Sequence, residues 1–466
     1  MSPNRGDKPG GPSRRGLLKA GLVAGAVAGT GAWSPAEASA IRSGWHRKFR
    51  KPGSLPYPKL PMGTDTIPQI EHIVILMMEN HSYDNRLGML RRCGADGFRL
   101  GHDGKPLATN PYANGYIQHA FRMPTTCQLT GKPTQEWEQA HIQFNGGRNN
   151  GFVESLSGPV AMGYWEKADQ PFYYSMASVF PISDRYFCSL LGQTYPNRRY
   201  LISATSLGMV DDTLPSLTSY PPNGTIFDKV HDAGLSWRDY YTTSSTTELY
   251  PELYLKNYGK NVVKIAEFFK DAAAGTLPAL SLVEPNYGTQ SEEDPQNIVV
   301  GEQFAASVID AVMKGPGWSK TLLVWNYDEH GGYFDHVPPP PALAPDDIPP
   351  DVIGSEPTYN GFHQYGFRVP MAVISPWSRP RYVSHVVNDH TSICALVETK
   401  WNLPAMTYRD ANAGNLLDMV DLRHPAFLHP PCLAKPLLDT DPSSQKCSVT
   451  GPGHIPPPGS VSPPPS

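Results

Sequence analysis

Two apolar runs in the chain stop abruptly at clusters of polar and charged residues. Residues 70–78 (IEHIVILMM) are followed at once by ENHSYD, and residues 321–325 (TLLVW) lead into NYDEHGGYFDH. A short apolar run predicts a buried strand, and α/β enzymes present ligands at the carboxyl ends of such strands. Taken alone, the second run fits a strand followed by a solvated acidic turn equally well.

Further apolar runs alternate with helix-type patterns along the middle of the chain. We predict strands at residues 237–241, 279–283 and 369–374, and helices at residues 301–313 and 390–399. In the first helix the apolar side chains recur every three or four residues, as on the buried stripe of an amphipathic helix. Strands that alternate with helices predict an α/β fold with a mostly parallel central sheet flanked by helices.

The two ends of the chain differ from this middle part in composition. Residues 1–40 carry a twin-arginine pattern (SRRGLLK), a Gly/Ala-rich apolar run and a final ASA, which predict a twin-arginine signal peptide. The apolar run is short and rich in glycine, which disfavours a retained membrane anchor. We expect a linker or arm at residues 41–69, a catalytic domain at residues 70–435 with a loop-rich cap at residues 91–180, and a Pro/Ser-rich tail at residues 436–466, disordered beyond its last cysteine.

Charge and composition exclude some classes of function. The chain has 39 Lys and Arg against 43 Asp and Glu, with no long basic run outside the N-terminus, so we expect no nucleic-acid partner. The 49 prolines and 42 glycines favour a loop-rich enzyme over a helical bundle. Export by the twin-arginine machinery would leave the protein secreted or associated with the cell envelope.

The six cysteines are too few for a disulfide scaffold in a chain of 466 residues. A bridge between Cys432 and Cys447 is favoured, because these residues flank a Pro/Ser/Asp-rich loop, and a bridge between Cys93 and Cys127 is a weaker alternative. The two other cysteines lie in apolar segments and are predicted to be buried thiols: Cys188 and Cys394.

Oxygen-bearing side chains stand at the predicted ends of two strands. Neighbouring parallel strands can bring such side chains within a few ångströms of each other. Carboxylate and amide oxygens are ligands that suit a divalent cation. The candidate ligands are Glu79, Asn80, Asp328 and Glu329.

Thr194 follows an apolar segment and precedes a predicted helix start. The backbone N–H groups and positive end of a helix favour a phosphate beside this hydroxyl, and Arg198 can neutralise a phosphate oxygen. With a metal ion nearby, these groups suit phosphoryl transfer through a covalent phospho-enzyme. Spacing alone also allows an ordinary turn residue at Thr194.

Seven segments within residues 70–405 carry motifs of one known family, in that family's order. They are IEHIVILMMENHSYDNRLG, FNGGRNNGF, GQTYPNRRYLISAT, LSLVEPNY, NYDEHGGYFDHVPPP, SPWSR and NDHTSICALVETKWNL. On these motifs the chain resembles the bacterial phosphoesterase family that contains exported phospholipases C and acid phosphatases. That family belongs to the alkaline-phosphatase-like superfamily, so the resemblance implies an alkaline-phosphatase-like α/β fold.

The resemblance also implies roles for particular residues. The four candidate ligands match the family's metal site, which implies one divalent ion, with Ca, Zn, Mg and Mn all open. Thr194 matches the nucleophile, and we place Asn197 and Arg198 at the phosphate. Histidines near the family's site assist the phosphate and the leaving group, and each candidate is equally well explained as a hydrogen-bonded histidine near the site: His141, His336 and His390.

Two positions depart from the family pattern. Asp294 in SEEDPQN stands where an Asp-His-Pro type motif has a histidine, and Gln135 stands where many members have histidine. An acid at Asp294 can bind a metal ion or a cationic headgroup such as choline. These departures change the expected substrate more than the expected reaction.

The resulting expectation is an exported, metal-dependent phospholipase C that cleaves phosphatidylcholine-like lipids through a phospho-threonine. One alternative is a broad-specificity acid phosphatase acting on small phosphoesters, and another is a catalytically weakened surface binding protein. Aromatic residues in the loops of residues 112–174 are consistent with peripheral membrane contact or with cap packing.

Overall fold

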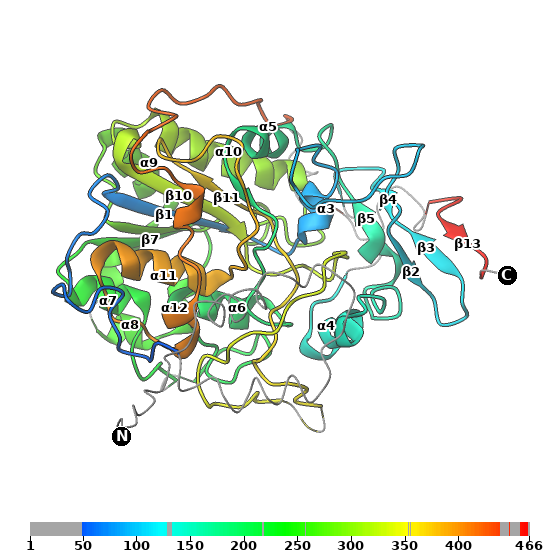
Figure 1. Ribbon diagram of the computed structural model, residues 1–466, viewed down its shortest axis with the longest axis horizontal. Coiled ribbons are helices and arrows are strands. Elements are labelled where there is room, and N and C mark those ends of the chain that lie inside the picture. The colour runs from blue at the N-terminus through cyan, green and yellow to red at the C-terminus, as the bar shows by residue number, and fades with distance from the viewer. Residues whose placement is uncertain are drawn as a thin grey trace, which may run out of the picture. The chain divides into compact units, whose positions relative to one another are not determined.

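An eight-stranded sheet forms the centre of the computed structural model (Figure 1). The structure describes residues 49–127, 133–216, 219–256, 258–352, 354, 356–438, 447 and 457–464, and the chain from Phe49 onward forms one compact unit. The predicted signal peptide lies outside the described residues.

Seven of the eight strands run in the same direction. In order across the sheet they are β12 (Val383–Ser384), β6 (Ile182–Ser183), β11 (Met371–Ile374), β10 (Thr321–Tyr327), β1 (His72–Met78), β9 (Leu280–Val283), β7 (Trp237–Tyr241) and β8 (Val262–Lys264). Only β11 is antiparallel to its neighbours, β10 and β6. The prediction of a mostly parallel sheet is therefore confirmed.

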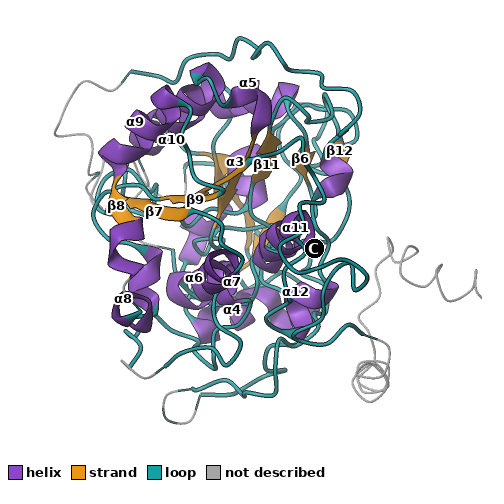
Figure 2. Ribbon diagram, turned by 90° about the vertical axis from the view of Figure 1, so that its left-hand side faces the viewer, coloured by secondary structure: helices purple, strands orange, loops and turns teal. Residues whose placement is uncertain are grey.

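Helices cover both faces of this sheet. Figures 1 and 2 show one layer on one side of the strands and a second layer on the other. The first layer contains α5 (Pro171–Val179), α9 (Ile265–Ala274) and α10 (Ile298–Lys314). The second contains α6 (Thr194–Ser203), α7 (Ile226–Asp232), α8 (Glu252–Leu255), α11 (His390–Trp401) and α12 (Tyr408–Asn412).

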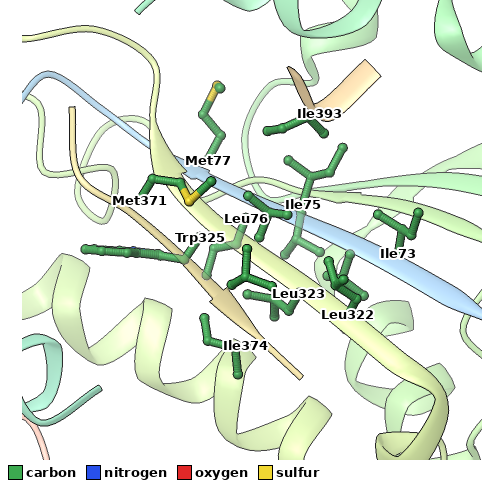
Figure 3. Close-up of a cluster of buried hydrophobic side chains, with 14 of the residues drawn as sticks. Ile73, Ile75, Leu76, Met77, Leu322, Leu323, Trp325, Met371, Ile374 and Ile393 are labelled. Carbon is green, nitrogen blue, oxygen red and sulfur yellow. The ribbon is translucent and has the colours of Figure 1, made fainter. Parts of the chain in front are cut away.

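The central strands are apolar on both sides because both faces of the sheet are covered. Every side chain of β10 is buried, and so are those of β1 after its first residue. Figure 3 shows this core, in which Leu76 and Trp325 come from paired positions of the two strands and Ile393 comes from α11. At the start of α11, Asp389 and Ser392 form a capping box.

The smaller elements lie mainly in the predicted cap and its surroundings. They are α3 (Tyr83–Leu87), α4 (Trp137–Phe144), β2 (Thr109–Pro111), β3 (Ile117–His119), β4 (Phe121–Arg122), β5 (Gly163–Tyr164) and β13 (Val461–Ser462). β13 pairs antiparallel with β3, so the prediction of a wholly disordered tail beyond Cys447 is wrong for these residues. Backbone pairing to β3 supplies the order that the Pro/Ser-rich sequence does not predict.

The disulfide predictions are also wrong. Cys127 is bonded to Cys447, with their Cα atoms 5.6 Å apart, whereas Cys93 and Cys432 are free and exposed. The pairing of β13 with β3 brings the end of the chain to the cap, which proximity in sequence cannot indicate. The two thiols predicted to be buried are free and buried: Cys188 and Cys394.

We expect a Cys127→Ser/Cys447→Ser variant to be less stable. The bond closes a loop of 320 residues, and loss of such a loop lowers the free energy of unfolding by roughly 6 kcal/mol in the chain-entropy model. Urea unfolding followed by circular dichroism measures this change. A Cys93→Ser/Cys432→Ser variant is the matched control, and an equal loss in that variant would contradict the pairing.

Candidate active site

The register of two central strands brings the candidate metal ligands together. Met78 pairs with Tyr327, so β1 and β10 end at the same level and Glu79 and Asp328 follow side by side. The backbone N–H of Asn80 donates to Asp328 Oδ1 at 3.1 Å. The four predicted ligands therefore meet at one edge of the sheet, as expected from the strand pattern.

A close backbone approach holds this turn. Asn80 adopts φ +65°, and a Cβ on Gly331 would stand 1.9 Å from the carbonyl oxygen of Asn80. Gly331 itself has φ +64° and donates its N–H to Glu329 Oε2 at 2.7 Å. A side chain at Gly331 cannot fit without moving the Asn80 backbone.

Thr194 lies beside these ligands as the first residue of α6. Its Oγ1 is 3.3 Å from the terminal amide atom of Asn80, and its side chain is only 7% exposed. Asn197 holds the preceding turn: its Oδ1 accepts from Ser189 N–H at 2.8 Å and its Nδ2 donates to Gln193 O at 3.0 Å. These bonds give Asn197 a positioning role, while direct phosphate contact by Asn197 stays a prediction.

Arg198 lies at the centre of a cluster of carboxylates. It contacts Asp328 at 3.2 Å, Glu284 at 3.3 Å and Glu79 at 3.4 Å, and all these side chains are buried. The guanidinium also lies 5.0 Å from the ring centre of Tyr287. Burial disfavours its charge, but the surrounding acidic groups raise the pKa of Arg198, so it stays a cation.

The donor set fits a divalent cation. The Asn80 amide group lies between two of the carboxylates, where its nitrogen donates to Glu329 Oε1 at 2.7 Å and to Asp328 Oδ1 at 3.3 Å. Glu79 Oε2 is buried and has no hydrogen-bond partner among the described residues. Burial, and then repulsion by Asp328, raises the pKa of Glu329. A cation among these oxygens would relieve each of these costs.

Two acids that the sequence reasoning missed add to this negative charge. Repulsion by Glu293 contributes to the raised pKa values of Glu79, Asp328 and Glu329. Asp212 accepts from the Tyr195 N–H at 2.7 Å, and burial followed by nearby acids raises its pKa to about 7. For Glu293 a signal did exist, because it stands in the acidic run SEEDPQN that departs from the family pattern.

Asp294, expected at a metal ion or a cationic headgroup, has another partner. Its carboxyl group contacts Tyr333, whose ring stacks on His81 with centroids 5.1 Å apart. Its neighbour Glu293 acts on the ligand cluster instead. A headgroup or metal role for Asp294 stays a prediction.

Of the three candidate histidines, His390 lies against the ligand turn. Its Nε2 is 2.5 Å from the Asp328 carbonyl oxygen and its Nδ1 is 3.0 Å from the Tyr186 hydroxyl. Burial lowers the pKa of His390 to about 3, so its ring is neutral at neutral pH. His330, which the sequence reasoning did not single out, also lies here, with Nδ1 3.3 Å from Glu329 Oε2 and Nε2 2.7 Å from Gln143.

His141 and His336 have other partners. His141 bonds to the Trp137 carbonyl at 2.7 Å and stacks on Tyr359 at 3.8 Å. His336 lies 2.6 Å from Asp84 in a separate buried ion network. No contact among the described residues joins either histidine to Thr194, so their predicted catalytic roles stay predictions.

The network around His336 has the geometry of a metal site but holds its own cation. The ligand atoms of Asp84, Asp335 and His336 lie within 4.8 Å of one another, which would allow an ion. However, Arg368 donates to Asp335 at 2.8 Å and to Asp84 at 3.1 Å. This guanidinium compensates both carboxylates, and in the described part of the chain no contact joins the group to Thr194, so we interpret it as a structural ion network separate from the candidate site.

Comparison with known proteins agrees with the order of these motifs. The model of the Phosphoesterase family matches residues 70–404. The chain belongs to the Phosphoesterase family. As a member of it, the protein is a phosphoric-ester hydrolase.

Several curated relatives of this Phosphoesterase family chain are phospholipases C. Phospholipase C A of Mycobacterium tuberculosis is 31% identical over 432 residues, covering 81% of this chain and 82% of the relative. Non-specific phospholipase C1 of Arabidopsis thaliana is 32% identical over 377 residues, covering 74% and 70%. A solved protein in the alkaline phosphatase superfamily from Vibrio parahaemolyticus overlaps at 9% identity with a TM-score of 0.39, covering 77% and 72%. None of the described helices is long and apolar enough to cross a membrane.

The His336 network predicts a stability change with pH. Burial opposes the charge of His336, but Asp84 and Asp96 raise its pKa to about 10. The stabilisation is therefore complete below the unfolded value of about 6.5 and is lost as the pH rises towards 10. At low pH the wild type should have a larger free energy of unfolding than His336→Gln. We expect this difference to fall by roughly 2–3 kcal/mol between pH 6 and pH 10, a value reduced for solvent screening because the side chain is partly exposed.

Urea unfolding at both pH values measures this advantage. His424→Gln is the control, because His424 pairs with Asp421 on the surface. A constant difference between the wild type and His336→Gln would contradict the charged state of His336.

Proposed function

We propose that this phosphoric-ester hydrolase is an exported, metal-dependent phospholipase C acting on phosphatidylcholine-like lipids. The observation that carries the proposal is the position of Thr194, at the start of α6 and next to the Asn80 amide and the carboxylates. The relatives named as phospholipases C support the substrate class. The twin-arginine pattern and the bond between Cys127 and Cys447, which suits an oxidising compartment, support export.

The metal ion would be held by Glu79, Asn80, Asp328 and Glu329. When bound, it would supply positive charge that polarises the phosphoryl group and stabilises an alkoxide at Thr194. The protein's own contribution is a set of buried oxygen ligands that directly follow two central strands. Which divalent ion binds stays open.

The proposed reaction consists of two successive displacements at phosphorus. The Thr194 Oγ1 forms a bond to phosphorus, and the bond from phosphorus to the diacylglycerol oxygen breaks. The proton lost by the Thr194 hydroxyl passes through solvent to that oxygen, and diacylglycerol leaves. Water next breaks the bond between phosphorus and Thr194 Oγ1, which releases the phosphorylated headgroup and restores the hydroxyl.

Charge at the transferred phosphoryl group is stabilised by two parts of α6. The positive end of the helix lies at Thr194, and one turn later Arg198 presents its guanidinium. Glu284 keeps Arg198 in place and is itself fixed by Thr246, whose N–H donates to it at 2.6 Å. The site therefore has a nucleophile and a rigidly held cation on one helix.

We expect Thr194→Ala to lose turnover of p-nitrophenylphosphorylcholine by roughly 10³-fold or more, because the covalent route is removed. Thr194→Ser retains a hydroxyl and should keep most of the activity. Thr276→Ala, at an exposed threonine, is the control. Steady-state rates measure all three, and full activity of Thr194→Ala would refute the nucleophile.

The same assay distinguishes the alternatives when p-nitrophenyl phosphate is the second substrate. A phospholipase C prefers the phosphorylcholine ester, and an acid phosphatase prefers the monoester. If the metal-loaded protein hydrolysed neither ester, the catalytically weakened binding protein would be the remaining alternative.

We expect a chelator to lower turnover by at least about 100-fold, since the positive charge that would polarise the phosphoryl group is then removed. Adding back Ca, Zn, Mg or Mn singly identifies the active ion. Asp328→Asn should also reduce the metal content measured by elemental analysis, while Asp310→Asn, a surface acid paired with Lys314, should not. An unchanged metal content in Asp328→Asn would contradict the ligand assignment.

A further inference from the structure

Three surface segments touch the candidate site and one another. We call them the rim: residues 134–159, residues 207–216, and residues 343–352 with 356–362. Gln143 of the first lies 2.7 Å from His330, next to the ligand Glu329.

The other two segments complete this arrangement. Asp212 of the second accepts from Tyr195 N–H at 2.7 Å, directly after Thr194. The third bridges the other two: Asp351 N–H donates to Gly208 O at 2.7 Å, and Trp137 Nε1 donates to Pro357 O at 3.0 Å. The rim thus borders both halves of the site.

A small apolar core fixes the rim to the site. It joins side chains from all three segments to the turn before Thr194 and to α6, and consists of Trp137, Leu190, Tyr200, Val210 and Phe362. Movements of the rim and of α6 are therefore coupled through packed side chains.

Large apolar side chains of the rim face the solvent. Leu156 is 72% exposed and Leu214 is 70% exposed, whereas Thr194 is 7% exposed. Ile142, Ile348 and Tyr359 are exposed as well. Single exposed leucines are common on protein surfaces, but several on segments that border one site indicate a contact surface.

The charge of the rim restricts what can cover it. Its residues include nine carboxylates and one basic residue, Arg148. An anionic lipid surface would be repelled by such a surface. A second copy of the chain, related by a two-fold axis, would place the same carboxylates opposite one another. The acids are Glu136, Glu138, Glu154, Asp211, Asp212, Asp346, Asp347, Asp351 and Glu356.

We propose that the rim docks on a bilayer of zwitterionic, choline-type phospholipid, with Leu156 and Leu214 inserted among the acyl chains. This inference rests on the proposed phospholipase C function. Leucine burial supplies the adhesion, Tyr359 lies at the interface, and the exposed carboxylates of the rim face the quaternary ammonium groups. Asp212 and Asp346 are held by Tyr195 and Thr205 and are not counted among these. Docking places the scissile phosphate of a lipid next to the segments that border Thr194.

Sedimentation with phosphatidylcholine vesicles tests the docking. The protein carries Thr194→Ala, so that the lipid stays intact. Leu156→Ser/Leu214→Ser should weaken binding by about tenfold or more, because binding then no longer transfers two leucine side chains from water into the bilayer. Leu107→Ser/Leu438→Ser is the matched control, since these leucines are 55% and 86% exposed outside the rim. For the protein with both rim leucines intact, replacing a third of the phosphatidylcholine with phosphatidylserine should also weaken binding.

Turnover with an intact Thr194 separates the two proposals. The rim variant should keep full turnover of soluble p-nitrophenylphosphorylcholine and lose vesicle hydrolysis about tenfold. If the wild type did not hydrolyse the soluble ester, the proposed function would be overturned. The sedimentation experiment would then still test the docking by itself.

Three vesicle-binding results would overturn the docking. They are absent wild-type binding, equal losses in the rim and control variants, and preference for phosphatidylserine vesicles. If light scattering showed a dimer that the rim variant loses, the occupant would be a second copy and not lipid.

Discussion

Arg198 bonds to carboxylates that follow three neighbouring strands, Glu79 after β1, Glu284 after β9 and Asp328 after β10. Buried charges are stable only when they are paired, so this ion cluster fixes how the strand ends and α6 meet. The position of Thr194 depends on it, because α6 carries both the hydroxyl and the guanidinium. Loss of one partner would leave the others charged and buried, which is more costly than loss of an exposed ion pair.

The strand ends were predictable because their signal is local. Continuous apolar runs such as those before Glu79 and Asp328 occur where both faces of a sheet are covered, and the first polar residues after them lie at the sheet edge. The strands β6 and β12 have two residues each and leave no such pattern. The apolar run of β11 predicted a strand but not its antiparallel direction, which depends on the path of the connecting chain.

The histidines and cysteines could not be placed from the sequence because their partners are distant along the chain. Asp84 favours the charged form of His336 and the nearby Arg368 opposes it, so the charge of His336 depends on the folded chain. His141 stacks on Tyr359, more than two hundred residues away. In the acidic run, Glu293 rather than Asp294 acts on the ligand cluster, since adjacent side chains in an irregular segment point in different directions.

The bond between Cys127 and Cys447 makes most of the chain a covalent ring. Thr194, Arg198, Asp328 and His390 all lie within the ring, whereas Glu79 lies on the arm that precedes it. A single protease cut inside the ring therefore leaves both pieces joined through the sulfur atoms. Such a nicked molecule keeps Thr194 and the two central strands within one covalently joined molecule.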